Sequence, residues 1–556
     1  MDHAEEVEAL PTAAAEKASL DEQEFSPRGK KRAHPEQIYA ESISGLEVTW
    51  NDKDAVVTFL KSEDDCRLCL VGRASLTCLE GDLKVLGYHM TQDMSVEVTS
   101  PSWSSFITVT GASLNARLQL VSIRPESDRP SFRLVSPVDS RPTVIPQSWS
   151  QAVDQISQEW VATRSRRPET SLDDTLKRRQ ARVVVCGAKG VGKSTCVRYT
   201  VNRLLKDYPQ VAILDADVGQ PELSPPGVLT LSVTTRPLLA PPHVNLMGQN
   251  CDITTVSSLF FGCITHKVDP SRYMDCLAHL IQQYEMQLTE DGDETQLPLV
   301  VNLDGWVKGM GYQVLTSLLT TTIQASQIIQ ILGETRAKQF ELTDVCCSEE
   351  TKLHAVDACT NNSDFHHLNV VTSSIPPSAL RELRLGAYFA PRSEIWDVDA
   401  GRLQQGWMDD DCVLANHVAS DFPYCVPMEA VDYFLVGDDR QDIVSESMIL
   451  EALNGNIVGL CTSSEAPLEC LGLGIVRSID WAKRLFYILT PVDPEQLHNV
   501  KALVGGNLQL PLQFYFRGVS AESFPYLNCS PNNAAALGTD PMKSRNNITR
   551  RSNGNN

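Results

Sequence analysis

The residues best suited to chemistry in this 556-residue chain lie in the glycine-rich segment 187–195. Its spacing, G-x-x-x-x-G-K-S, is that of a phosphate loop, in which glycines let backbone amides surround an anion. The apolar run before it predicts a buried strand, and Cys196 begins a predicted helix whose N-terminal amides point at phosphate. We expect Lys193 against the β- and γ-phosphates and the Ser194 hydroxyl on Mg²⁺. The predicted nucleotide contacts are Gly187, Ala188, Lys189, Gly190, Val191, Gly192, Lys193, Ser194 and Thr195.

A second apolar run, 211–214, ends in two carboxylates, Asp215 and Asp217, followed by the break Val218-Gly-Gln-Pro221. Alternation places both carboxylates on one side of a strand end, and ligands of parallel α/β sheets bind at the carboxyl ends of the strands. Beside a phosphate loop, the pair suits a Mg²⁺ ligand and a group that accepts a proton from an attacking hydroxyl.

Two other classes of phosphate-loop protein fit less well. A GTPase would carry an Asn-Lys-x-Asp guanine-binding motif after a later strand, and the chain has none. Partitioning-type ATPases have an extra lysine directly after the first glycine, where this chain has Ala188 and places Lys189 one position later.

Two further segments carry groups that can bind substrate. Asn302-Leu-Asp-Gly-Trp306 is a predicted strand end that opens into a glycine-rich loop, and its Trp306 either stacks on a nucleobase or packs on the neighbouring helix. Arg381 and Arg384 are three residues apart, so they share one face of a predicted helix. That face either reaches over a triphosphate or is simply solvated.

Composition limits the possible partners and compartments. The net charge is −22, so a polyanionic substrate must bind in a local basic groove. The 42% of hydrophobic residues are enough to form large cores. The sixteen cysteines and the lack of an apolar leader favour a reducing intracellular compartment, and no segment is predicted to span a membrane. Cys66 and Cys69 have the spacing of a zinc knuckle without a second pair, so we interpret them as structural thiols.

The pattern of elements predicts an α/β fold in which a central kinase domain with a parallel sheet is flanked by two β-rich domains. Strands are expected at 183–186, 211–215, 298–303, 327–332 and 367–372. The basic cluster at 28–32 is either a nuclear localisation signal or part of a solvated tail. The basic linker at 147–182 is either a solvated helix or a segment that contacts nucleic acid. The predicted segments are a disordered tail at 1–38, a β-rich domain at 39–146, a basic linker at 147–182, the kinase domain at 183–395, a second β-rich domain at 396–528 and a disordered tail at 529–556.

Taken together, these motifs resemble those of the polynucleotide 5′-hydroxyl kinases. The resemblance rests on the phosphate loop, the run 214–227, the Asn302 to Trp306 loop with its following glycines, and the helix 381–389. The Gln-Pro-Glu-x-Ser-Pro-Pro-Gly sequence at 220–227 resembles the nucleolar branch, which acts in ribosomal RNA processing. The motifs depart from the family in Leu303, where a threonine is usual, and in Ala216 and Val218, where leucine and proline are more frequent.

The resemblance implies transfer of the γ-phosphate of ATP, with Mg²⁺, to the 5′-hydroxyl of an RNA end, and to DNA as an alternative acceptor. Asp217 would orient and deprotonate the hydroxyl, and Asp215 would support the metal together with Ser194. By the same resemblance, the catalytic residues are Lys193, Asp215, Asp217, Arg381 and Arg384. Those that hold the acceptor end are Gln220, Asn302, Gly305 and Trp306.

A different class of function stays open: an ATP-binding assembly subunit that holds an endoribonuclease and transfers little phosphate. The retained Asp217 and the paired arginines favour chemistry, because a pure nucleotide binder needs only Lys193 and Ser194. The resemblance implies that the partner is the endoribonuclease that cuts internal transcribed spacer 2, and that the protein acts in the nucleus and nucleolus.

Overall fold

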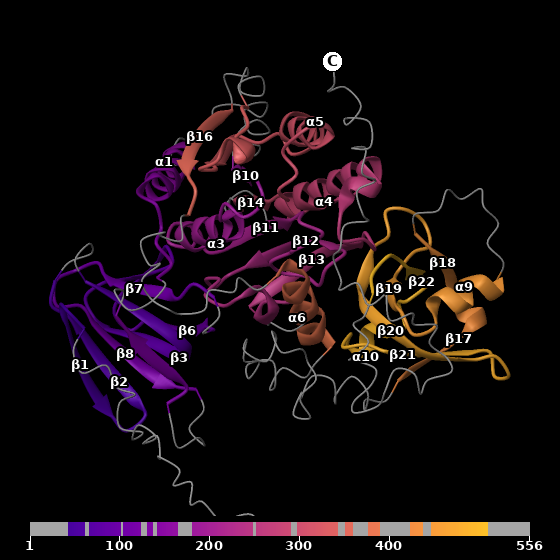
Figure 1. Ribbon diagram of the computed structural model, residues 1–556, viewed down its shortest axis with the longest axis horizontal. Helices are drawn as coiled ribbons and strands as arrows, with labels where there is room; N and C mark the ends of the chain where they lie inside the picture. Colours follow the sequence, from indigo (N-terminus) through magenta and orange to yellow (C-terminus); the bar gives the residue numbers. More distant parts are fainter. Residues whose placement is uncertain are drawn as a thin grey trace, which may run out of the picture. The chain divides into compact units, whose positions relative to one another are not determined.

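The computed structural model describes most of the chain, and its sheets follow one another in sequence order (Figure 1). The described residues are 43–61, 66–101, 104–123, 130–136, 142–164, 181–247, 252–290, 297–342, 351–359, 376–389, 423–436 and 446–509. They form a nine-stranded sheet, a seven-stranded sheet with helices, and a six-stranded sheet. This arrangement confirms the predicted α/β class with a β-rich region on either side of the phosphate-loop domain.

The first sheet is antiparallel throughout and is organised by the long strand β3, which pairs with β6, β7, β8 and β9. Its strands alternate buried and exposed residues, as in β2, where Ala55, Val57 and Phe59 enter the core. Cys66 and Cys69 are buried in this region, and the Cys66 thiol donates to the Gly45 carbonyl over 2.8 Å. The strands are β1 (Leu46–Asn51), β2 (Asp54–Phe59), β3 (Arg67–Glu80), β4 (Leu83–Val85), β5 (Tyr88–Met90), β6 (Ser95–Ser100), β7 (Ile107–Gly111), β8 (Arg117–Ser122) and β9 (Phe132–Val135).

The central sheet has the order β13-β12-β11-β14-β10-β15-β16. The five strands from β11 to β16 in that order are parallel, whereas β12 and β13 are antiparallel additions at one edge. The predicted parallel sheet is therefore present in these five strands, and the two antiparallel strands at its edge were not expected. The strands are β10 (Arg182–Gly187), β11 (Val211–Asp215), β12 (Val228–Thr234), β13 (Ile253–Phe260), β14 (Leu299–Asn302), β15 (Gln327–Leu332) and β16 (Lys352–Asp357).

Helices cover both faces of this sheet, with α1 and α3 on one side and α4 and α5 on the other (Figure 1). Helix α1 forms the first part of the predicted basic linker. Its Trp149 and Trp160 are buried, and the Trp149 indole Nε1 donates to the Asp357 carbonyl over 2.7 Å. The basic residues 166–179 that follow lie outside the described residues. The helices are α1 (Gln147–Arg164), α3 (Lys193–Leu204), α4 (Pro270–Glu290), α5 (Met310–Ser317) and α6 (Pro377–Phe389), with short turns η2 (Pro242–Val244), η3 (His266–Val268), η4 (Leu318–Thr322) and η5 (Arg336–Lys338).

Strand β10 is the point at which the strand order reverses. The chain leaves β10 for β11 on one side of it and later places β15 and β16 on the other side. In open α/β sheets ligands bind outside the carboxyl end of such a strand, because the following loops diverge there. The loop at 187–192 lies at that position and leads into α3.

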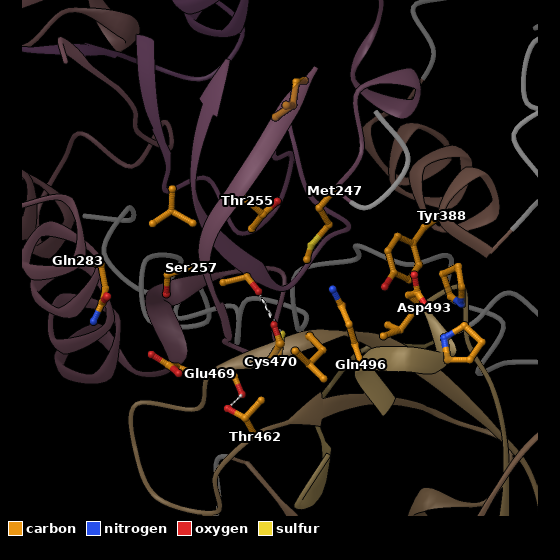
Figure 2. A pocket seen from close by; sticks show the side chains of 17 residues that line it. Met247, Thr255, Ser257, Gln283, Tyr388, Thr462, Glu469, Cys470, Asp493 and Gln496 are labelled. Atoms are coloured by element: carbon orange, nitrogen blue, oxygen red, sulfur yellow. Dashed lines mark hydrogen bonds between the residues drawn. The ribbon is translucent and has the colours of Figure 1, made fainter. Parts of the chain in front are cut away.

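The last sheet shares a core with helix α6 and with β12 and β13. Leu385, Tyr388 and Phe389 of α6 are buried among residues of this sheet such as Leu473. A cavity of about 950 Å³ lies between β13 and this sheet, with Tyr388 on its wall (Figure 2). The elements are β17 (Tyr424–Pro427), η8 (Met428–Ala430), β18 (Asp432–Leu435), α9 (Glu446–Leu453), β19 (Ile457–Cys461), β20 (Cys470–Asp480), β21 (Leu485–Leu489), α10 (Pro494–Leu497) and β22 (Ala502–Gly505). Within the described ranges, no helix combines the length and hydrophobicity needed to cross a membrane.

Candidate active site

The phosphate loop has the backbone that anion binding requires. Gly190 and Gly192 have φ of 73° and 99°, a left-handed conformation that glycine adopts at little cost. Helix α3 starts at Lys193, so its free N-terminal amides and positive dipole end face the loop. The loop and the helix N-terminus together fit the phosphates of a nucleotide.

Lys193 is buried, and its ammonium donates to the Ala188 carbonyl over 3.2 Å across the loop. Burial lowers the pKa of Lys193, whereas the charges of Asp217 and Asp304 raise it. The lysine thus lies within the field of two carboxylates that come from different strands. One of them, Asp304, is absent from the predicted site.

Asp215 is fully buried at the end of β11, and both of its carboxylate oxygens accept hydrogen bonds. Oδ2 accepts from the amides of Glu222 and Leu223 over 2.5 and 2.9 Å, and Oδ1 accepts from Asn302 Nδ2 over 2.9 Å. Burial raises the pKa of Asp215 to about 7. These bonds hold the loop after β11 against β14.

Asp217 lies two residues further on and is only partly buried. Its Oδ1 accepts from the amides of Gly219 and Gln220, each over 2.9 Å, in a turn that orients the carboxylate. The half-buried Gln220 is therefore held beside Asp217, and the position of both near the acceptor stays a prediction. Among the described residues, no hydrogen bond to Asp217 Oδ2 occurs.

The loop after β14 lies directly on the phosphate loop. A Cβ at Gly305 would come within 2.7 Å of the Lys189 amide nitrogen, so only glycine permits this contact. Asp304 Oδ1 accepts from the Trp306 amide over 3.2 Å and fixes the turn. The carbonyl oxygen of the Asn302 side chain is buried and has no hydrogen-bond partner within the described part of the chain, so an acceptor hydroxyl fits there as a donor.

Trp306 is partly exposed and is flanked by two residues of η3. The Lys267 ammonium lies 5.5 Å from the centre of the indole, and the His266 ring lies 5.1 Å from it at a tilt of 52°. Gly311 of α5 packs against the same side chain. Both predicted roles of Trp306 are therefore compatible with the geometry, since it packs on a helix and still has exposed surface.

His266 and Asp304 form a pair that sequence reasoning missed. The His266 Nδ1 lies 3.5 Å from Asp304 Oδ2, and the imidazole stacks on Tyr273 with ring centres 4.2 Å apart. The Tyr273 hydroxyl in turn donates to the carbonyl of Ala216, between the two aspartates. Burial lowers the pKa of His266 to about 4, whereas burial and the charge of Asp217 raise the pKa of Asp304 to about 7.

Arg381 and Arg384 are both buried in α6, so the face that they share is not a solvated one. Arg384 Nη1 donates to Leu380 of its own helix over 3.3 Å, and its Nε has no partner among the described residues. Burial lowers the pKa of Arg384, while nearby carboxylates raise it. Tyr388 anchors the same helix to the last sheet, since its hydroxyl accepts from the Leu473 amide over 2.9 Å. A buried guanidinium with an unsatisfied donor fits an anionic phosphoryl group.

A magnesium ion fits this site through few protein ligands. Within the described part of the chain, no three His, Cys, Asp or Glu side chains are grouped for metal binding. Mg²⁺ in kinases is usually held by one or two side chains together with substrate phosphates and water, so this finding suits the chemistry. Ser194 at the start of α3 and the carboxylate of Asp217 are the available groups.

Comparisons with known proteins match all three regions of the chain. Residues 48–117 match the N-terminal domain of "Polynucleotide 5′-hydroxyl-kinase NOL9", residues 187–390 match the P-loop of "mRNA cleavage and polyadenylation factor CLP1", and residues 419–511 match the "NOL9-like, C-terminal domain".

Curated relatives agree with these matches. The chain is 29% identical over 383 residues to an Arabidopsis thaliana protein named polynucleotide 5′-hydroxyl-kinase NOL9, covering 68% of this chain and 94% of that one. It is 27% identical over 369 residues to the Homo sapiens protein of that name, covering 59% and 49%, and 24% identical over 428 residues to polynucleotide 5′-hydroxyl-kinase grc3 of Schizosaccharomyces pombe, covering 67% and 54%. The match therefore spans nearly all of the plant relative and about half of the other two.

Solved structures show the same fold. Clp1p in the wild-type Clp1p–Pcf11p complex is 12% identical, covers 83% of this chain and 98% of that one, and superposes with a TM-score of 0.51. A second structure of the Clp1p and Pcf11p pair gives a TM-score of 0.52 at the same identity, covering 83% and 99%.

Proposed function

We propose that this chain is a P-loop kinase of the polynucleotide 5′-hydroxyl-kinase family, which transfers the γ-phosphate of ATP to the 5′-hydroxyl of RNA ends in pre-ribosomal RNA processing. The observation that carries the proposal is the convergence of Lys193, Asp217 and the Asn302 to Trp306 loop at the carboxyl end of β10 and its neighbours. A phosphate donor and a hydroxyl acceptor can meet there.

The residues of the phosphate loop would hold the donor. The backbone of 187–192 and the N-terminus of α3 bind phosphate oxygens, and Lys193 neutralises their charge. Mg²⁺, when bound beside Ser194, supplies further neutralisation of the charge that develops on the transferred group. Arg384, and with it Arg381, would contribute a buried positive charge from α6.

Asp217 would orient the acceptor hydroxyl and take its proton. Its turn with Gly219 and Gln220 fixes Oδ1 and leaves the other oxygen available. Asn302 and Trp306 hold the 5′ end, the first through its unpartnered amide oxygen and the second by stacking. Asp215 supports this arrangement by holding both loops, and its metal-binding role with Ser194 stays a prediction.

Transfer of labelled γ-phosphate from ATP to a short 5′-hydroxyl RNA tests the proposal directly. The wild-type protein is expected to label the RNA, while the Asp217→Asn variant and the Arg381→Ala/Arg384→Ala double variant are not. A 5′-phosphorylated RNA of the same sequence is the matched negative substrate. Label that appears equally with Asp217→Asn would contradict the role of this carboxylate.

A second candidate function is that of an ATP-binding assembly subunit of an endoribonuclease. The solved structures favour this type of arrangement, because in them Clp1p is bound to Pcf11p. It predicts nucleotide binding without labelled RNA. Repeating the assay with the endoribonuclease that cuts internal transcribed spacer 2 separates a pure subunit from a kinase that needs its partner. Nuclear and nucleolar localisation is part of the same proposal.

A further inference from the structure

The turn η3 places a positive charge over the indole of Trp306. The Lys267 ammonium lies 5.5 Å from the centre of the indole, within the roughly 6 Å at which a cation is attracted to the face of an aromatic ring. Lys267 is exposed, whereas Trp306 is only partly exposed. A cation from one loop therefore lies against the aromatic side chain that the proposed function assigns to the acceptor end.

The backbone of η3 is fixed to the loop after β14 through the first residue of the turn. His266 is buried, its imidazole stacks on Tyr273 with ring centres 4.2 Å apart, and its Nδ1 lies 3.5 Å from Asp304 Oδ2. The Thr265 hydroxyl caps the turn by accepting from the Lys267 amide over 3.4 Å. The backbone at Lys267 is therefore held beside the loop, while its long side chain extends from the protein surface.

The nearby carboxylates do not neutralise the charge of Lys267. Asp304 Oδ1 accepts from the Trp306 amide, and Asp304 Oδ2 faces His266. Asp269, two residues after Lys267, accepts from a backbone amide of α4 over 3.0 Å. Within the described part of the chain, no carboxylate lies within ion-pair distance of the Lys267 ammonium. This cation is therefore available to an anionic ligand.

An ammonium beside a partly exposed indole suits a single-stranded nucleic acid, whose bases stack on aromatic rings and whose phosphates bind basic side chains. A base that stacks on Trp306 displaces the ammonium from the face of the ring, and the ammonium then requires another partner. The terminal nucleotide of a 5′-hydroxyl end has no phosphate on its 5′ side. The nearest anionic group of the strand is therefore the phosphate on the 3′ side of that nucleotide.

We propose that Lys267 binds the first internucleotide phosphate of the acceptor strand, on the 3′ side of the nucleotide that stacks on Trp306. The inference rests on the proposed function, since it takes a 5′-hydroxyl RNA end as the acceptor. Lys267 exchanges the indole for this phosphate when the strand binds. A nucleoside without a 3′-phosphate lacks the group that Lys267 binds and is therefore a poor acceptor.

Binding of a short 5′-hydroxyl RNA with a fluorophore at its 3′ end to the full chain, measured by fluorescence anisotropy without ATP, tests the proposal. The native RNA is compared with one that carries an uncharged methylphosphonate at the first internucleotide linkage. The wild-type protein is expected to bind the native RNA about tenfold more tightly, because a hydrogen bond between charged groups contributes roughly this factor. Lys267→Met is expected to bind both RNAs equally, with the affinity that the wild type has for the modified RNA.

Three controls show whether the effect is specific to this charge and this linkage. Lys267→Arg keeps a cation at the same position and is expected to retain the preference for the native RNA. Lys206→Met removes an exposed lysine just after α3 and is expected to behave as the wild type. A methylphosphonate near the 3′ end of the RNA is expected to leave the affinity of the wild type unchanged.

Two outcomes overturn the proposal. If the wild type binds both RNAs equally, or binds neither, the first phosphate is not recognised, and a loss of affinity in Lys267→Met then reflects only its contact with Trp306. If the preference persists in Lys267→Met, another residue binds the phosphate. Because the measurement needs no ATP, absence of phosphoryl transfer would contradict the proposed function alone, and transfer without the preference would contradict only the role of Lys267.

Discussion

The side-chain amide of Asn302 donates a hydrogen bond to the carboxylate of Asp215 over 2.9 Å, joining the ends of two neighbouring parallel strands. The bond occupies the one oxygen of Asp215 that the loop amides leave free. Asp215, the last residue of β11, is therefore tied to both loops, whereas under the proposed function Asp217, two residues further on, is the carboxylate that meets the substrate.

Exchanging each aspartate for asparagine separates these tasks. Asp217→Asn is expected to lower kcat by about 10² to 10⁴, because a proton acceptor is lost, with no change in urea unfolding. Asp215→Asn is expected to lower the free energy of unfolding by about 1 to 3 kcal/mol, because its amide faces the donor of Asn302. Equal effects of both variants on kcat and on stability would contradict the division.

Removing the charge of Lys193 tests the phosphate loop. Lys193→Ala is expected to lower the transfer rate by about a thousandfold or more, because no other cation of the loop is buried against the phosphates. The fold is expected to stay intact by circular dichroism. Lys206→Ala, at an exposed position just after α3, is the matched control. A wild-type transfer rate in Lys193→Ala would contradict the proposed role of Lys193 in phosphoryl transfer.

Trp306 is expected to act on the acceptor and not on the nucleotide. Trp306→Ala should raise KM for the RNA about tenfold, since one stacked base contributes roughly 1 to 3 kcal/mol, while KM for ATP stays constant. Trp306→Phe keeps a ring and should recover most of the affinity. If Trp306→Ala changes stability but neither KM, the indole has only the packing role against Gly311.

Asp304 makes stability depend on pH. Its pKa rises from 3.8 to about 7 in the folded protein, chiefly through burial, so the folded state retains a proton that the unfolded state loses. The resulting stabilisation is fully present below about pH 4 and is lost as the pH rises through about 7. In urea unfolding of the nucleotide-free protein, Asp304→Asn should show a smaller decrease in stability across this range than the wild type. Parallel pH curves for the two proteins would exclude this contribution.

Much of the central sheet was predictable because its strands are continuous apolar runs that end in recognisable motifs. The strands expected near 183, 211, 298 and 327 are present as β10, β11, β14 and β15. The last strand of the sheet is β16, which pairs with β15. It was not expected, because its lysine, histidine and aspartate interrupt the apolar pattern of a buried strand. The segment expected to be the last strand, 367–372, lies outside the described residues. Sequence alone also did not reveal that β12 and β13 turn antiparallel, because both pairing directions bury such strands equally well.

Candidate site residues that belong to a sequence motif could be predicted, whereas residues that come together from distant elements could not. His266 and Tyr273 come from η3 and the start of α4, and no local pattern brings them to Asp304. Asp304 could have been identified from the sequence, because it is an ionisable residue two positions after the end of β14. That end of the strand faces the phosphate loop. Asp215 and Asp217 were expected on one side of the strand, but β11 ends at Asp215, so alternation does not extend to Asp217.

Gly305 and Lys189 are in contact, since a side chain at 305 would meet the Lys189 backbone at 2.7 Å. The proposed sites for ATP and for the acceptor end therefore share a wall. A shift of the phosphate loop on nucleotide binding must then move the acceptor loop, and a shift of the acceptor loop must move the phosphate loop. Binding free energies linked in this way are reciprocal. ATP and the RNA end are therefore expected to change each other's affinity by the same factor, whichever binds first.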